Sequence, residues 1–414
     1  MANNFYRLSM LSLVLVSILF LSGCGVINAL RMRYANTNIE PVWPEHTQEV
    51  RLETYYISDK PYIKAKINDE QELLFLIDTG ASFTILMDSS KSQAVPLEPG
   101  FDLPMRGWGE EEESKGFQSK LDVLEFGGIR YEGLNIAYLP ASKTKYFLSE
   151  DEVVYDGIIG HDVLRHFAWT FDRSKGETIV RNRPHVKQSS ESELDMDVFM
   201  LKPSIPVEVH FESGKPIPYD VIIDTGSRHY FKLSTAYMEK YKIKPERTVS
   251  ALDFGLSGAA KHQRFALPKI KMGDNEFNHV KANIIKGDDE DDWWVVGNAL
   301  LSKQTFTIDY IREKFYLAPA ETSAITSRFN LLGLELRKTL SGSFIVRHVF
   351  PELPAQQTGI RVGDRITAID GIPSKQMSEN DWLDVTNTPG KHEICVDAAC
   401  WQVNAKHIKG YSIQ

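Results

Sequence analysis

The tripeptide Asp-Thr-Gly occurs twice in the sequence, at residues 78–80 and at residues 224–226. One copy alone would be a weak signal, because these residues form ordinary turns in many β proteins. Two carboxylates that a fold holds about 3 Å apart cannot both ionise cheaply, so such a pair keeps one proton over a wide pH range. The ionised acid can deprotonate a water molecule while its protonated partner donates to a carbonyl oxygen. This hydrolytic chemistry requires no metal and no cofactor.

An internal repeat surrounds the two acids. Each tripeptide follows an apolar strand, predicted at residues 73–77 and at residues 219–223. Further along the chain, each half has a pair of β-branched residues that ends on a glycine, at Gly160 and at Gly297. Several matched features in the same order indicate a duplication, and the short strands with Gly, Asn and Asp turns predict a mainly β fold.

Length and composition exclude several other classes of protein. The chain has 414 residues with 47 Lys and Arg against 56 Asp and Glu, giving a formal net charge of −9. This length predicts two or three domains, and the acidic balance argues against a nucleic-acid partner. Three cysteines cannot by themselves supply a four-ligand zinc site or a disulfide scaffold, and we expect no metal centre.

The N-terminus predicts an export signal. Arg7 is followed by an apolar stretch at residues 8–21, which is shorter than the roughly 20 residues of a membrane-spanning helix. Residues 21–24, Leu-Ser-Gly-Cys, resemble the lipobox of bacterial lipoproteins. The resemblance implies a lipid on Cys24, with a plain secretory signal as the alternative. By the sorting rule of such lipoproteins, Gly25 rather than Asp after the cysteine implies delivery to the outer rather than the inner membrane. The resemblance therefore predicts a periplasm-facing anchor in the bacterial cell envelope.

With its duplicated motif, the middle of the chain resembles the retropepsin-like aspartic proteases over about 270 residues. The resemblance implies a double-lobed acid protease fold in which Asp78 and Asp224 form the catalytic dyad. Because both lobes belong to one chain, it also implies that the active site needs no second subunit. The positions that it assigns to support of the dyad are Thr79, Gly80, Thr225, Gly226, Ser227, Gly160 and Gly297.

These supporting residues have different implied roles. The threonines would form hydrogen bonds between the lobes beneath the dyad, the motif glycines would let the carboxylates approach, and the two later glycines would brace the catalytic loops. Ser227 could also donate to the outer oxygen of Asp224, whereas Ala81 cannot do so for Asp78. We therefore hypothesise that Asp224 carries the charge and Asp78 the proton.

Two glycine-containing segments could close over a substrate. The first begins at residues 107–109 and extends to Gly116, and the second is at residues 255–258. Ordinary surface hairpins remain the alternative for both.

The C-terminal part resembles the PDZ domains attached to bacterial periplasmic proteases, through the sequence at residues 351–371. In that family, the loop corresponding to Leu332, Gly333 and Leu334 presents backbone N–H groups to a peptide's C-terminal carboxylate, and the next strand pairs with the peptide. A purely structural role, docked against the lobes, is the alternative.

Cys395 and Cys400 fall in a predicted hairpin. Outside the cytoplasm a disulfide between them is plausible, and two free thiols are the alternative.

Composition and motifs together give the expected division of the chain. The predicted parts are a lipoprotein signal at 1–23, a membrane-proximal linker at 24–49, a first protease lobe at 50–182, a linker at 183–197, a second lobe at 198–317, a linker at 318–330 and a small PDZ domain, α+β and barrel-like, at 331–414.

The function expected from the sequence is that of a membrane-anchored aspartic endopeptidase that hydrolyses proteins or peptides. A non-catalytic lipoprotein that only binds peptides in the cleft and the PDZ domain is the alternative. Two intact Asp-Thr-Gly motifs favour the enzyme, because a binding protein does not need two ionisable groups at these positions.

Overall fold

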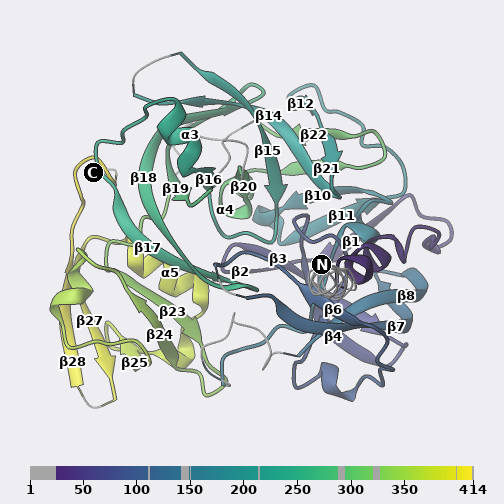
Figure 1. Ribbon diagram of the computed structural model, residues 1–414, viewed down its shortest axis with the longest axis horizontal. Helices are drawn as coiled ribbons and strands as arrows, with labels where there is room; N and C mark the ends of the chain where they lie inside the picture. Colours follow the sequence, from purple (N-terminus) through teal and green to yellow (C-terminus); the bar gives the residue numbers. More distant parts are fainter. Residues whose placement is uncertain are drawn as a thin grey trace, which may run out of the picture.

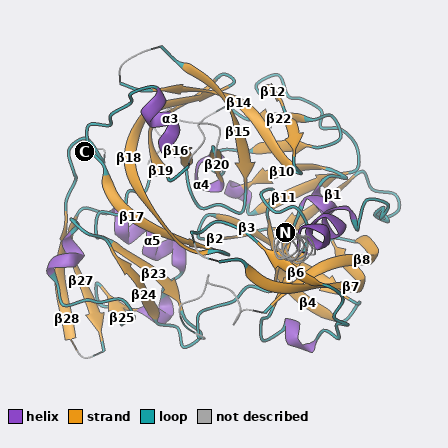
Figure 2. Cartoon of the chain, viewed as in Figure 1, coloured by secondary structure: helices purple, strands orange, loops and turns teal. Residues whose placement is uncertain are grey.

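The computed structural model describes residues 25–110, 112–140, 149, 151–212, 215–287, 294–319, 327–397 and 399–412. Its regular structure consists mainly of β-strands, as predicted, arranged in two eight-stranded and two six-stranded sheets (Figure 1, Figure 2). The signal peptide and Cys24 lie outside the described residues.

The first eight-stranded sheet belongs to the first half of the chain and has the strand order β2-β3-β4-β9-β5-β8-β7-β6. Its strands are β2 (Tyr55–Ile57), β3 (Lys60–Ile67), β4 (Gln71–Ile77), β5 (Ile85–Met87), β6 (Asp102–Met105), β7 (Ser114–Phe126), β8 (Ile129–Leu139) and β9 (Gly157–Ile159). The short helices η1 (Ser92–Ala94) and α2 (His161–Leu164) belong to the same half.

The second eight-stranded sheet repeats this arrangement strand by strand, in the order β13-β14-β15-β20-β16-β19-β18-β17. Its strands are β13 (Asp197–Phe199), β14 (Lys202–His210), β15 (Ile217–Asp224), β16 (Phe231–Ser234), β17 (Val249–Gly255), β18 (Gly258–Met272), β19 (Asn275–Ile285) and β20 (Val295–Gly297), with helices α3 (Thr235–Lys240) and α4 (Asn298–Leu301). The identical strand order shows that the matched sequence features do mark a structural repeat.

A six-stranded sheet joins the two halves, in the order β1-β11-β10-β21-β22-β12. Its strands are β1 (Glu49–Glu53), β10 (Ala168–Asp172), β11 (Glu177–Arg181), β12 (Ser192–Asp195), β21 (Phe306–Asp309) and β22 (Lys314–Leu317), with η3 (Arg173–Lys175) between β10 and β11. At its centre, β10 and β21 are antiparallel, and the rings of Phe171 and Phe306 stack with their centroids 4.8 Å apart. The apolar side chains of both halves form one continuous core.

The C-terminal sheet has the order β23-β24-β25-β27-β28, and β26 pairs with β25. Its elements are β23 (Leu334–Lys338), β24 (Phe344–Val349), η4 (Pro354–Gln357), β25 (Arg365–Ile369), β26 (Ile372–Pro373), η5 (Ser374–Gln376), α5 (Glu379–Asn387), β27 (Gly390–Val396) and β28 (Ala399–Ala405). Its core also takes in Val249 and Ala251 of β17, and the guanidinium carbon of Arg347 lies 3.7 Å from the ring centroid of Phe254. The C-terminal domain therefore packs directly on the second lobe (Figure 1).

The segments predicted as linkers contain ordered structure where they are described. Residues 183–197 include β12, which pairs with β22 in the joining sheet. Residues 25–34 form a helix on the first lobe, and Phe329 belongs to the C-terminal core. Among the described residues, none of the helices combines the length and the apolar character that crossing a membrane requires.

Candidate active site

The two Asp-Thr-Gly segments meet at equivalent places in the repeat. Asp78 directly follows β4, which runs parallel to β9, and Asp224 ends β15, which runs parallel to β20. Each motif therefore leaves a central strand of its own sheet at the carboxyl end.

Crossed hydrogen bonds tie the two segments together. Thr79 N donates to Thr225 Oγ1 and Thr225 N donates to Thr79 Oγ1, both over 3.1 Å. Thr79 Oγ1 donates to the carbonyl of Ile223 over 2.6 Å, and Thr225 Oγ1 to that of Ile77 over 2.7 Å. Both threonines are buried, so the four bonds fix the two Asp-Thr-Gly loops against each other.

The motif glycines bring the two acids to the same place. A methyl group on Gly226 would lie 2.2 Å from Cγ of Asp78, and one on Gly80 would lie 2.9 Å from Cγ of Asp224. Each carboxyl group thus packs on the glycine of the opposite motif, and any side chain there would displace it.

Burial and the neighbouring Asp224 raise the pKa of Asp78 from 3.8 to about 7, although the Gly80 N–H, which donates to Asp78 Oδ1 over 2.8 Å, opposes the shift. This direction is the one required by the hypothesis that Asp78 holds the proton. The cause differs from the one expected, because in the described part of the chain the Ser227 hydroxyl accepts from His229 N and has no hydrogen bond to Asp224.

The two later glycines contact the loops that follow the acids. Gly160 N donates to Thr84 Oγ1 over 3.4 Å, and Gly297 N donates to the carbonyl of Tyr230 over 3.3 Å. The next residues continue the pattern in both halves, because the N–H groups of His161 and Asn298 donate to the carbonyls of Ala81 and Ser227. These contacts hold each Asp-Thr-Gly loop against the strand beside it.

The two glycine-containing segments lie at the tips of hairpins that touch each other. Ser257 N donates to the carbonyl of Trp108 over 3.0 Å, and Gly107 N donates to Ser257 Oγ over 3.2 Å. Ser114 Oγ donates to the carbonyl of Leu256 over 2.7 Å. The β6–β7 hairpin of the first lobe and the β17–β18 hairpin of the second lobe are therefore in a closed arrangement.

Lys232 is a residue of this site that the sequence analysis missed. It is buried on β16, and its Nζ lies 4.0 Å from the ring centroid of Trp108 at the hairpin tip. Burial lowers the pKa of Lys232, while Asp224, Asp253 and Asp78 act in the opposite direction. The signal was available in the repeat, because the residue at the matching register on β5 is the apolar Ile85.

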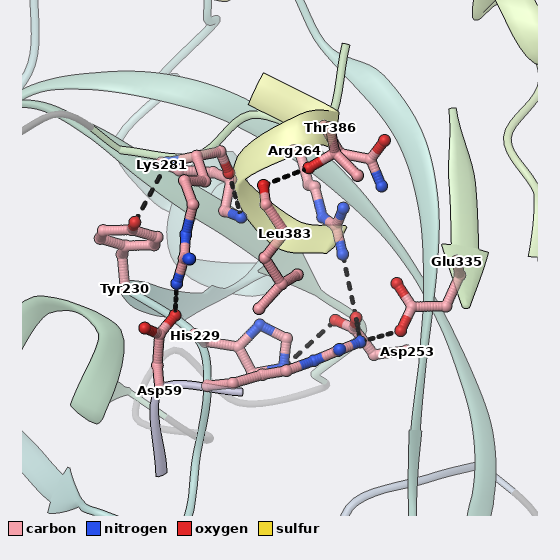
Figure 3. Close-up of a pocket in the computed structure, with 12 residues that line it drawn as sticks. Asp59, His229, Tyr230, Asp253, Arg264, Lys281, Glu335, Leu383 and Thr386 are labelled. Atoms are coloured by element: carbon pink, nitrogen blue, oxygen red, sulfur yellow. Dashed lines mark hydrogen bonds and ion pairs between the residues drawn. The ribbon is translucent and has the colours of Figure 1, made fainter. Parts of the chain in front are cut away.

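A buried polar cluster lies beside the second Asp-Thr-Gly loop (Figure 3). Asp253 of β17 forms an ion pair with Arg264 at 2.9 Å, and its other carboxylate oxygen lies 3.1 Å from His262 Nε2 and 3.2 Å from His229 Nε2. Arg228, two residues after Gly226, bonds to Glu335 of β23 in the C-terminal domain. The cluster thus connects this loop, the second hairpin and the C-terminal domain.

The predicted peptide-binding loop of the C-terminal domain is not open to solvent. Leu332 and Leu334 are fully buried, and Gly333 N donates to Asn330 Oδ1 over 2.9 Å. The outer edge of β23 is the edge with which the resemblance predicts that a peptide pairs. Residues 151–153 of the first lobe cover this edge.

These first-lobe residues pair with β23 through their backbone. Val153 N donates to the carbonyl of Lys338 over 3.1 Å, and Leu340 N donates to that of Asp151 over 2.7 Å. In this arrangement the C-terminal domain docks on the lobes, as the alternative interpretation expected. In the same domain, Cys395 and Cys400 form a disulfide.

Comparison with known protein families matches the same two regions that the structure distinguishes, the repeat and the C-terminal domain. A family model described as aspartyl protease matches residues 63–163 and 205–298. Both halves match one family. A model described as a PDZ domain matches residues 345–394. The chain thus contains an aspartyl protease-like region in two segments, followed by a PDZ domain.

Among solved structures, the chain is similar to the aspartic proteinase from Irpex lacteus, with 13% identity and a TM-score of 0.44. That similarity covers 66% of this chain and 98% of the proteinase. A search of the curated proteins finds no match.

Proposed function

We propose that this protein is an aspartic endopeptidase, anchored in the bacterial envelope through Cys24, in which Asp78 and Asp224 activate a water molecule. The observation that carries the proposal is the set of reciprocal contacts between the two Asp-Thr-Gly motifs. Their threonines hydrogen-bond to each other, and each carboxyl group packs on the opposite glycine. Such an arrangement places two acids where they share one proton.

The reaction follows from that shared proton. The ionised Asp224 takes a proton from water as the water oxygen attacks the carbonyl carbon, and the protonated Asp78 donates to the carbonyl oxygen. In the resulting tetrahedral intermediate the C–N bond breaks as Asp224 passes the proton that it took from water to the nitrogen. Asp78 takes back a proton from a hydroxyl of the intermediate, so the dyad returns to its starting state. The products are a carboxylic acid and an amine, and no acyl-enzyme forms.

The closed hairpins fit a substrate that is a polypeptide chain. Their tips are joined through backbone and serine hydrogen bonds, which can be exchanged for bonds to an extended peptide at little net cost. Closure around the peptide would exclude water from the dyad and strengthen its electrostatic interactions.

The test uses the full chain, purified in detergent, and an unfolded protein as substrate. Asp78→Asn and Asp224→Asn are each expected to lower the cleavage rate by at least about 100-fold. Asp220→Asn is the matched control, because Asp220 lies exposed on the same strand as Asp224. Equal cleavage by all four proteins would reject the proposal, and peptide binding without cleavage by the wild type would favour a binding protein instead.

A further inference from the structure

The helix of residues 25–34 leaves one apolar face uncovered. Val26, Ile27, Leu30 and Tyr34 are 62%, 56%, 46% and 63% exposed. With 3.6 residues per turn, these four side chains fall within an arc of about 100° and so form a single face.

The opposite face of this helix is fixed to the first lobe. Met32 is buried in a cluster that includes Leu103 and Met105 of β6, and Asn28 Nδ2 donates to the carbonyl of Asp102 over 2.9 Å. Figure 1 shows the helix in purple beside the first lobe. The exposed face therefore has a defined orientation relative to the protein.

Two arginines flank the apolar face. By helical geometry, Arg33 lies about 20° beyond Val26 on one side, and Arg31 lies about 40° beyond Ile27 on the other. The Arg31 guanidinium carbon also lies 4.5 Å from the ring centroid of Phe101. An apolar stripe between two cationic borders matches a bilayer surface, where acyl chains lie beneath a layer of phosphates.

The position of the helix in the chain selects the same partner. Residue 25 directly follows Cys24 in the sequence, and the earlier residues 8–21 are apolar. This step rests on the membrane anchor of the proposed function, which would bring residue 25 to the bilayer surface. Residues 25–34 span about 15 Å as a helix, half of the roughly 30 Å hydrocarbon layer, so this segment is too short to cross a bilayer.

We propose that residues 25–34 form an interfacial helix that lies in the plane of a phospholipid bilayer. Its apolar face enters the boundary between headgroups and acyl chains, and its arginines lie at the phosphates. Because the opposite face of the helix packs on β6, the β6–β7 hairpin is held next to the membrane. Substrate would then reach the two acids close to the bilayer surface.

The test measures the depth of single fluorescent labels. The full chain carrying Leu30→Cys is labelled with an environment-sensitive dye and reconstituted into phosphatidylethanolamine–phosphatidylglycerol liposomes. Leu340→Cys is the matched control, because Leu340 is 69% exposed but belongs to the C-terminal domain. The label at residue 30 is expected to be quenched at least twofold more by nitroxides on lipid acyl chains than by aqueous iodide, and the control label in the reverse order.

The same experiment separates the ways in which the proposal can fail. Equal quenching of the two labels by iodide would overturn it. A label at residue 30 that is shielded from both quenchers, in detergent as well as in liposomes, would show that a second copy of the chain covers the face instead. Flotation of unlabelled wild-type protein with the liposomes tests the anchor separately, and a cleavage assay tests the peptidase.

Discussion

Removing one of the crossed threonine hydroxyls should weaken both the fold and the catalytic site. Thr79→Val keeps the shape of the side chain but removes the donor to the carbonyl of Ile223 and the acceptor for the N–H of Thr225. Both backbone groups are left in a buried environment, where an unsatisfied group costs about 1–3 kcal/mol. We therefore expect a loss of about 2–4 kcal/mol in the free energy of unfolding, after some relaxation of the structure.

The two motifs make equivalent hydrogen bonds, so the same reasoning predicts the effect of a second variant. Thr225→Val removes the equivalent pair of bonds, to Ile77 and Thr79, with nearly the same distances. The two variants should therefore lose the same stability to within about 1 kcal/mol. Both should also have a lower kcat, because each catalytic loop is held by the other.

Urea denaturation followed by tryptophan fluorescence, together with initial cleavage rates, provides the assay. Thr170→Val is the control, because its hydroxyl contacts Thr307 in the joining sheet rather than the catalytic loops. This control should lose stability but keep its kcat. If Thr79→Val behaved like Thr170→Val, or if it kept the stability of the wild type, the role assigned to the crossed bonds would be wrong.

Three further changes should have measurable effects. Burial and Asp224 raise the pKa of Asp78 from 3.8 to about 7, so its contribution to stability is fully present below about pH 4 and is lost as the pH rises through 7. The Asp78→Asn variant, which resembles the neutral acid, should have a higher melting temperature than the wild type at pH 8 and the same melting temperature at pH 4. Equal melting temperatures at both pH values would contradict this. Burial alone would raise the pKa of Asp253, but the histidines and arginines around it hold that pKa well below its usual value, so its contribution to stability is present above about pH 4 and is lost on acidification. Asp253→Asn should lower the free energy of unfolding by about 3–5 kcal/mol at pH 7 in a urea titration, and a loss below about 1 kcal/mol would contradict this. Val153→Pro removes the N–H that bonds to the carbonyl of Lys338 and so should free the edge of β23. By fluorescence anisotropy, the PDZ domain of this variant should bind a peptide C-terminus at least about tenfold more tightly than that of the wild type. Unchanged affinity would show that this contact does not control peptide access to β23.

The repeated motif allowed much of the protease-like part to be predicted. An apolar strand before each Asp-Thr-Gly and a β-branched pair before each later glycine are local patterns, and they marked strands that are central in both sheets. The mainly β fold was predicted for the same reason, since strand and turn signals depend on a few neighbouring residues. The motif residues of the two halves lie together in the structure, although the chain separates them widely.

The remaining features depend on contacts between distant parts of the chain. β12 has the polar sequence Ser-Glu-Leu-Asp, which looks like a linker, and it becomes a strand because β22 offers it a paired edge. Lys232 and Asp253 would be placed on the surface by their charge, yet both are buried. The contact between residues 151–153 and β23 joins two regions whose sequences carry no common pattern. In each case tertiary pairing outweighs the local preference.

The antiparallel pairing of β10 with β21 has a consequence for how such a chain could be divided. If the chain were cut between its halves, each fragment would have one inner strand of the joining sheet as an unpaired edge strand, which could pair with another strand. Because β10 and β21 are equivalent in the repeat and run in opposite directions, the partner strand could come from the other fragment or from a second copy of the same fragment. Covalent continuity therefore decides which pairing occurs, and it lets the two halves of the repeat diverge independently.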